Sequence, residues 1–139
     1  MKVFLDANIL VSVLNKEYPL FTFSSRLLSL ADSKKFSLFA SPVGLAIAFY
    51  FSEKKSGSEL ARKKIEVLTD KLRITTVDES VVRKSLGDRK VKDIEAGLQF
   101  YSALKSGCQC IVTEDREDFY FATVEVLSTE EFLKQHAWS

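Results

Sequence analysis

A chain of 139 residues with 46% hydrophobic and 28% charged residues has the length and composition of one globular domain. Its 20 basic and 19 acidic residues nearly cancel, which excludes a general attraction to nucleic acid or anionic membranes, so any phosphate-binding surface must be local. The apolar runs are too short to span a bilayer and the N-terminus does not read as a signal peptide, so we expect no membrane segment.

The two cysteines give no sign of a disulfide framework. Cys108 and Cys110 lie too close in the sequence to join distant parts of the chain. A Cys-x-Cys pair can belong to a metal site, but no second cysteine or histidine pair accompanies it, and His136 lies in the tail. We therefore expect packing thiols and a reducing, cytoplasmic environment.

The first predicted element is a short, wholly apolar strand over residues 3–5, which ends at Asp6. Apolar runs and helical periodicity then predict a helix over 8–14, a helix over 23–34, a strand over 37–40 and a helix over 43–53. Ser41 and Pro42 start the last of these helices, because serine caps helices and proline is tolerated in the first turn.

The second half of the chain continues the alternation of helices and strands. It is predicted to contain helices over 59–71, 79–87, 91–105 and 129–135, and strands over 73–77, 110–113 and 124–127. Asp78, Gly107 and the capping box of Ser128 and Glu131 mark helix ends. Strands separated by helices pair in parallel, so we expect an α/β fold, a three-layer α/β/α sandwich with a mainly parallel sheet of about five strands.

Acidic side chains are predicted to gather at one edge of this sheet. Asp6 follows the first strand, while Thr113, Glu114 and Asp115 end the fourth strand and Asp118 lies just beyond. Ligands of parallel sheets bind at this carboxyl edge, near the reversal of strand order. Clustered carboxylates repel one another unless a cation compensates, and Mg²⁺ or Mn²⁺ prefers their oxygens and can activate water against a phosphodiester. Any one of these aspartates alone is better explained as a helix or turn cap.

Two segments resemble the signatures of the PIN domain family. Residues 3–10 are similar to the family's opening strand and turn, in which an aspartate binds metal and the residue two positions later is often asparagine, here Asp6 and Asn8. Residues 102–115, followed by Asp118, are similar to its second signature, in which a helix ends at glycine, a strand ends in threonine and acids follow. With the order of elements, the resemblance covers nearly the whole chain and implies a single PIN-like domain over 1–139.

The resemblance implies an endoribonuclease that uses Mg²⁺ or Mn²⁺ on single-stranded RNA, similar to the toxin half of bacterial toxin–antitoxin pairs. Asp6, Asp115 and Asp118 would be metal ligands, and Thr113 and Asn8 would orient a carboxylate or a water. An antitoxin protein and a second copy of the chain are the implied partners. A phosphatase of the haloacid-dehalogenase type would instead require a second aspartate at position 8.

Two acids of the family are not matched. Residues 45–50 lack the usual glutamate, and Ala96 replaces the aspartate expected before the fourth strand. Asp93 lies three positions earlier on nearly the same helix face and is the expected fourth ligand, whereas Glu95 is turned by about 100°. Asp93 is equally explained as an acid favoured at a helix N-terminus. The alternative function is therefore a catalytically impaired PIN-like module that binds RNA or a protein partner.

Basic and aromatic residues supply candidates for contacts with RNA. Arg89, Lys90 and Lys92 would reach flanking phosphates if the following helix begins at the mouth of the acidic pocket. The aromatic runs at 49–51 and 119–121 either stack on unpaired bases or fill the core, and core packing explains most of them.

Overall fold

The computed structural model describes residues 1–138. Its five strands are β1 (Lys2–Leu5), β2 (Ser37–Ala40), β3 (Arg73–Ile74), β4 (Cys110–Val112) and β5 (Glu125–Leu127). They form one sheet in the order β3-β2-β1-β4-β5, and every neighbouring pair is parallel. The predicted fold class, a parallel five-stranded sheet between helices, is confirmed.

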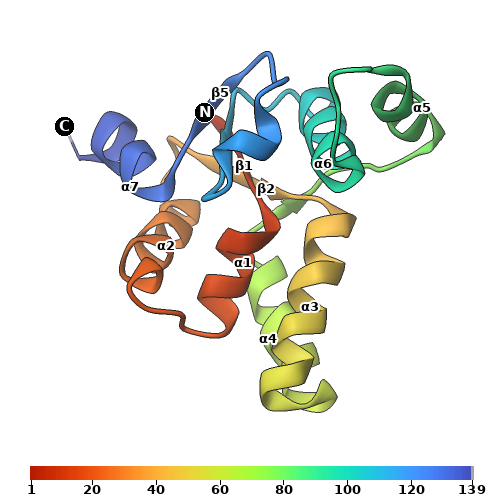
Figure 1. The fold of residues 1–139 in the computed structure, drawn as a ribbon. Helices are drawn as coiled ribbons and strands as arrows, with labels where there is room; N and C mark the ends of the chain where they lie inside the picture. The colour runs from red at the N-terminus through yellow and green to blue at the C-terminus, as the bar shows by residue number, and fades with distance from the viewer. Residues whose placement is uncertain (139) are drawn as a thin grey trace.

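Helices connect the strands and cover the sheet (Figure 1). They are α1 (Ala7–Leu14), α2 (Leu20–Ser29), α3 (Pro42–Ser56), α4 (Ser58–Thr69), α5 (Glu79–Gly87), α6 (Ile94–Lys105) and α7 (Thr129–Phe132), with short 3₁₀ helices η1 (Leu30–Asp32) and η2 (Arg116–Phe119) and a π-helical turn η3 (Leu133–Ala137). None of these helices is long and apolar enough to cross a membrane.

The alternation of side chains along β1 divides the core into two parts. Val3 and Leu5 pack on one face with apolar side chains of α1, α2, α4 and α7. Phe4 points to the other face, where it packs with Phe100 and Ala103 of α6. Because both faces are covered, Val3, Phe4 and Leu5 are all apolar, as predicted, and only Lys2 at the exposed start of β1 is charged.

The order of strands reverses at β1, which places β2 on one side of it and β4 on the other. Leu5 is in register with Val112, and the backbone N–H of Asp6 donates to the carbonyl of Val112 over 3.0 Å. The residues that follow β1 and β4 therefore leave the sheet side by side, at the edge where parallel sheets bind ligands.

Most predicted elements differ from the structure by a few residues at their ends, and three of these differences matter here. The third strand, at the edge of the sheet, ends at Ile74 instead of residue 77. The N–H of Thr75 still donates to the carbonyl of Ala40, and the chain then leaves the sheet toward α5. The sixth helix begins at Ile94 instead of residue 91, because Asp93 is extended and caps it. The helix predicted over 23–34 runs instead from Leu20 to Ser29.

The predicted caps and the packing role of the thiols agree with the structure. Ser41 accepts a hydrogen bond from the N–H of Gly44 at the start of α3, and Ser128 and Glu131 form the capping box of α7. Cys108 and Cys110 are free and buried, and burial raises the pKa of each thiol to about 12. Such thiols stay protonated and unreactive near neutral pH.

Candidate active site

Asp6 lies at the junction of β1 and α1. It caps α1, and Oδ1 accepts a 2.7 Å hydrogen bond from the backbone N–H of Ala7. The same oxygen accepts a 2.8 Å bond from the side-chain amide of Gln99, and Oδ2 accepts a 2.7 Å bond from the hydroxyl of Thr113. Three donors on three elements therefore hold the carboxylate in one orientation.

The environment of Asp6 opposes its negative charge. Burial raises the pKa of Asp6 above its ordinary value, the hydrogen bonds from Thr113, Gln99 and Ala7 lower it, and the charge of Asp115 raises it further. A buried carboxylate held by donors yet disfavoured by its surroundings is typical of a functional site.

A second set of hydrogen bonds joins α1 to the loop after β4. The side-chain amide of Asn8 donates to Oδ2 of Asp115 over 3.1 Å. Its carbonyl oxygen accepts from the N–H of Glu114 at 3.4 Å, and the N–H of Asp115 donates to the Thr113 hydroxyl over 2.9 Å. Asn8 and Thr113 thus orient the two aspartates on neighbouring strand ends.

These residues border a pocket of about 380 Å³ at the carboxyl edge of the sheet. All four predicted ligands line it, namely Asp6, Asp93, Asp115 and Asp118, as does Asn8, while Thr113 is buried and donates to Asp6. Partial desolvation raises the pKa of Asp118 above its ordinary value, and the nearby charges of Asp115, Asp93 and Glu117 raise it further. The acids therefore interact electrostatically across the pocket.

The donors fit a hard divalent cation in type, since all four are carboxylates. Within residues 1–138, however, no three acidic, histidine or cysteine side chains lie close enough together to hold a metal ion. Asp93 accepts a hydrogen bond from the N–H of Glu95 over 3.0 Å, and Asp6 and Asp115 are engaged as described. Mutual repulsion keeps uncompensated carboxylates apart, and a cation would supply the attraction that draws them together.

The two unmatched acid positions face this same pocket. Ile47 of α3 and Ala96 of α6 both line it, so apolar side chains stand where the family usually places carboxylates. Ala96 is 3% exposed and belongs to the core around α6. These two positions therefore add no carboxylate to the pocket, and its acids come from other places in the chain.

Three polar residues of the pocket were not predicted. Gln99 holds Asp6 from α6, Glu17 approaches from the loop after α1, and Glu95 lines the pocket although its helical angle from Ala96 predicted otherwise. The helical angle between Glu95 and Ala96 did not separate them, because both lie in the first turn of α6 and the pocket extends across both positions. A single buried glutamine within a helix leaves no signal in one sequence.

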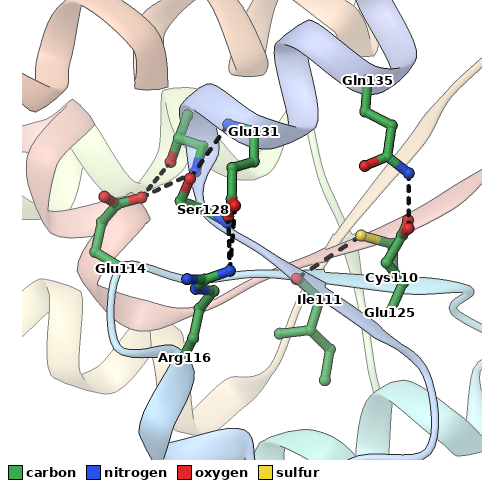
Figure 2. Close-up of polar contacts among 9 residues, drawn as sticks. Cys110, Ile111, Glu114, Arg116, Glu125, Ser128, Glu131 and Gln135 are labelled. Atoms are coloured by element: carbon green, nitrogen blue, oxygen red, sulfur yellow. Dashed lines mark hydrogen bonds and ion pairs between the residues drawn. The ribbon is translucent and has the colours of Figure 1, made fainter.

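The charged neighbours of Asp115 turn away from the pocket toward α7 (Figure 2). Glu114 accepts hydrogen bonds of 2.9 Å from both the N–H and the hydroxyl of Thr129. Arg116 pairs with both carboxylate oxygens of Glu131, at 3.0 and 3.2 Å. Glu114, expected to converge with the other acids, instead fixes the loop that carries Asp115.

Comparisons with known proteins agree with this fold. A family model described as PIN domain matches residues 2–117. The chain is 30% identical to "Ribonuclease VapC1" of Aquifex aeolicus over 138 residues, which cover 96% of this chain and 94% of that protein.

Solved structures show the same fold at lower identity. VapBC-1 of nontypeable Haemophilus influenzae matches with a TM-score of 0.71 and 17% identity, over 94% of this chain and 99% of that one. VapBC2 of Rickettsia felis, bound to a promoter DNA fragment, matches with a TM-score of 0.69 and 19% identity, over 92% of this chain and 98% of that one. VapC20 of Mycobacterium tuberculosis is described as a toxin that cleaves the sarcin–ricin loop. It matches with a TM-score of 0.63 and 16% identity, over 78% of this chain and 86% of that one.

Proposed function

Because the chain belongs to the PIN domain family, we propose that it is an endoribonuclease that hydrolyses phosphodiester bonds of single-stranded RNA with Mg²⁺ or Mn²⁺. The observation that carries the proposal is the gathering of Asp6, Asp93, Asp115 and Asp118 around one pocket. The relative from Aquifex aeolicus is named as a ribonuclease, which supports the activity. The description of the Mycobacterium tuberculosis neighbour supports RNA as the substrate.

Each side chain has a defined task in this proposal. Asp6, Asp115 and Asp118 would hold the cation, with Asp93 as an additional ligand from the start of α6. When bound, the cation acidifies water and neutralises the charge that develops on the phosphate. Thr113 and Gln99 orient Asp6 through its two oxygens, and Asn8 orients Asp115.

Cleavage of single-stranded RNA by the purified chain with added Mn²⁺ tests the proposal. Asp6→Asn keeps the size of the side chain and removes its charge, so we expect it to abolish cleavage. Asp70→Asn is the matched control, because Asp70 is exposed and outside the pocket, and it should cleave as the wild type does. Equal cleavage by Asp6→Asn would indicate a contaminating nuclease and remove support for this mechanism.

A catalytically impaired module that binds RNA or a protein is the second candidate. Ile47 and Ala96 favour it, because apolar side chains line the pocket at the two places where the family pattern has carboxylates. Calorimetric titration with Mn²⁺ separates the two candidates. Binding that is lost in Asp6→Asn would oppose a metal-free module, whereas no binding in several buffers would favour it over the enzyme.

We also infer an antitoxin-like protein partner. A groove lined by Ala46, Ile47, Tyr50, Phe51 and Glu95 adjoins the pocket and shares Ile47, Phe51 and Glu95 with it. Tyr50 and Phe51 are 51% and 45% exposed, more than aromatic side chains usually are. Two of the similar structures are described as VapBC complexes, which supports a partner of this kind.

Co-purification with the product of a small neighbouring reading frame tests this partner. Tyr50→Ser with Phe51→Ser should release the partner, whereas the exposed Val67→Ser on α4 should retain it. Retention by the double variant would contradict a partner in this groove. Self-association into a homodimer stays a prediction, which sedimentation equilibrium of the isolated chain would test.

A further inference from the structure

The loop between α5 and α6 carries three exposed cations within four residues, Arg89, Lys90 and Lys92. Within the described residues, none of the three forms an ion pair. Two cations of the flanking helices differ in this respect, since Arg83 pairs with Glu79 and Lys105 with Asp78. Residues 88–92, here termed the basic loop, contain these three cations and one acid, Asp88, whose charge interacts with that of Lys90, so the loop keeps a net positive charge.

The basic loop is held firmly against α6. Asp88 accepts a 3.0 Å hydrogen bond from the N–H of Lys90 and a 2.7 Å bond from the hydroxyl of Tyr101. Val91 lies so close to Gly97 that a Cβ added there would come within 2.6 Å of Val91 Cγ1. The three cations thus project from a fixed backbone, and a ligand would not have to order the loop itself.

The basic loop also borders the acidic pocket. It leads directly into Asp93, which lines the pocket, and its Lys90 carbonyl accepts a hydrogen bond from the hydroxyl of Tyr120, two residues after Asp118. Figure 1 shows α6 between α5 and the short η2 helix, and α6 contacts both of them.

Tyr120 differs from the aromatic residues on either side of it. Phe119 and Phe121 are 2% and 7% exposed and pack in the core, whereas Tyr120 is 54% exposed. The ammonium of Lys92 lies 5.6 Å from the centre of its ring. An exposed ring beside free cations combines base stacking with phosphate attraction, the two contacts by which proteins bind single strands without sequence preference.

We propose that the basic loop and Tyr120 form the rim that binds single-stranded RNA at the pocket. Arg89, Lys90 and Lys92 contact phosphates next to the one in the pocket, and the ring of Tyr120 stacks on an unpaired base. The pocket acids repel phosphates, so the cations compensate for that repulsion at its entrance. The placement of one phosphate of the strand in the pocket for cleavage rests on the proposed function, whereas the binding of the strand to this surface does not.

The test measures binding without metal, by anisotropy of a short fluorescent single-stranded RNA of mixed sequence over a series of KCl concentrations. Substitution of all three cations by glutamine should weaken binding by at least roughly 10-fold and lower the slope of log K against log salt by about 2, since each single-strand phosphate contact contributes about 0.7. Glutamine at Lys34, Lys63 and Arg73 removes the same charge from exposed positions elsewhere and should bind as the wild type does.

Tyr120 supplies an independent variant pair. Tyr120→Phe keeps the ring and should bind RNA as the wild type does, whereas Tyr120→Leu should weaken binding roughly 10-fold. Circular dichroism and melting curves verify that each variant is folded. Equal RNA affinity and salt slope in the wild type and the basic-loop variant, or no RNA binding by the wild type, would overturn the proposal.

Two further outcomes separate this surface from its alternatives. If the basic-loop variant loses affinity for polyglutamate but keeps its affinity for RNA, the surface serves an acidic protein and the proposal is wrong. If the wild type binds RNA through these residues but does not cleave it with Mn²⁺, the proposed nuclease activity fails while the binding surface stands.

Discussion

The side-chain amide of Gln99 donates a 2.8 Å hydrogen bond to Oδ1 of Asp6, although the two residues are 93 positions apart in the sequence. Gln99 is 3% exposed, and its own carbonyl oxygen has no hydrogen-bond partner within the described residues. A reversed amide would direct that oxygen at the carboxylate of Asp6. The arrangement therefore favours the pose in which Gln99 donates to Asp6.

Gln99→Leu should lower Mn²⁺ affinity and RNA cleavage by about 10- to 100-fold, the range found for residues that orient metal ligands. Calorimetry measures the metal affinity without relying on activity. Gln135→Leu is the control, because Gln135 bonds to Glu125 outside the pocket. Equal metal affinity in both variants would show that the bond to Asp6 has no positioning role.

Asp6→Asn should be more stable than the wild type in metal-free buffer at pH 7, by about 1 kcal/mol. Burial is the main cause of the raised pKa of Asp6, so the folded state binds this proton more tightly than the unfolded chain does. Above the folded-state pKa the charged carboxylate destabilises the fold, and this cost disappears as the pH falls below the ordinary value of 3.8.

Urea unfolding between pH 3 and 8 would measure this difference. We expect the advantage of Asp6→Asn to shrink steadily toward acid pH. Added Mn²⁺ should stabilise the wild type but not the variant, because a ligand that binds only the folded state raises its stability. A variant less stable than the wild type at pH 7 would contradict the expected cost of burying this charge.

Ile47→Glu should increase Mn²⁺ affinity by roughly 10-fold, because it adds a carboxylate to the wall of the pocket. Ile47 is only partly buried, so the substitution is expected to leave the fold intact. Tyr50→Glu adds the same charge to α3 at a residue that borders the groove but not the pocket. Equal gains in both variants would show a general effect of charge.

Gly97→Ala should destabilise the protein by about 1–3 kcal/mol, because the new Cβ would meet Val91 at 2.6 Å and Ser85 Cβ at 3.3 Å. Gly87→Ala is the matched control on the preceding helix, where nothing lies within 4 Å of an added Cβ, and it should be neutral or stabilising by about 0.5 kcal/mol. Denaturant midpoints measure both. Similar midpoints for the two variants would mean that the basic loop can move away from α6 without a loss of folding free energy.

The convergence of the residues that follow β1 and β4 could be predicted, because it depends on the order and direction of the strands. A central apolar strand followed by an aspartate, and a later strand followed by threonine and acids, predict adjacent residues as soon as the sheet is parallel. Asp6 and Thr113 are indeed joined by a 2.7 Å hydrogen bond. The position of Asp93 was argued from a helix that includes it, whereas Asp93 precedes α6 and reaches the pocket as its cap.

The other parts of the site depend on how elements pack. Gln99 resembles any polar residue within a helix until α6 is placed across the end of β1. Glu114 and Asp115 are consecutive acids, and only the position of α7 determines that the first turns away while the second lines the pocket. One sequence contains no signal for such choices, because they depend on contacts between elements.

The contacts of Glu114 and Arg116 with α7 make this short helix a brace for the pocket. Asp115 lies between these two residues, so loosening α7 would remove the contacts on both sides of Asp115 and leave it held by Asn8 and Thr113 alone, while Asp6 would keep its place after β1. A fusion, cut or ligand that acts on α7 would then resemble, in a cleavage assay, the loss of an aspartate that it never touches. A loss of cleavage in such a variant therefore identifies a ligand only if α7 is still folded.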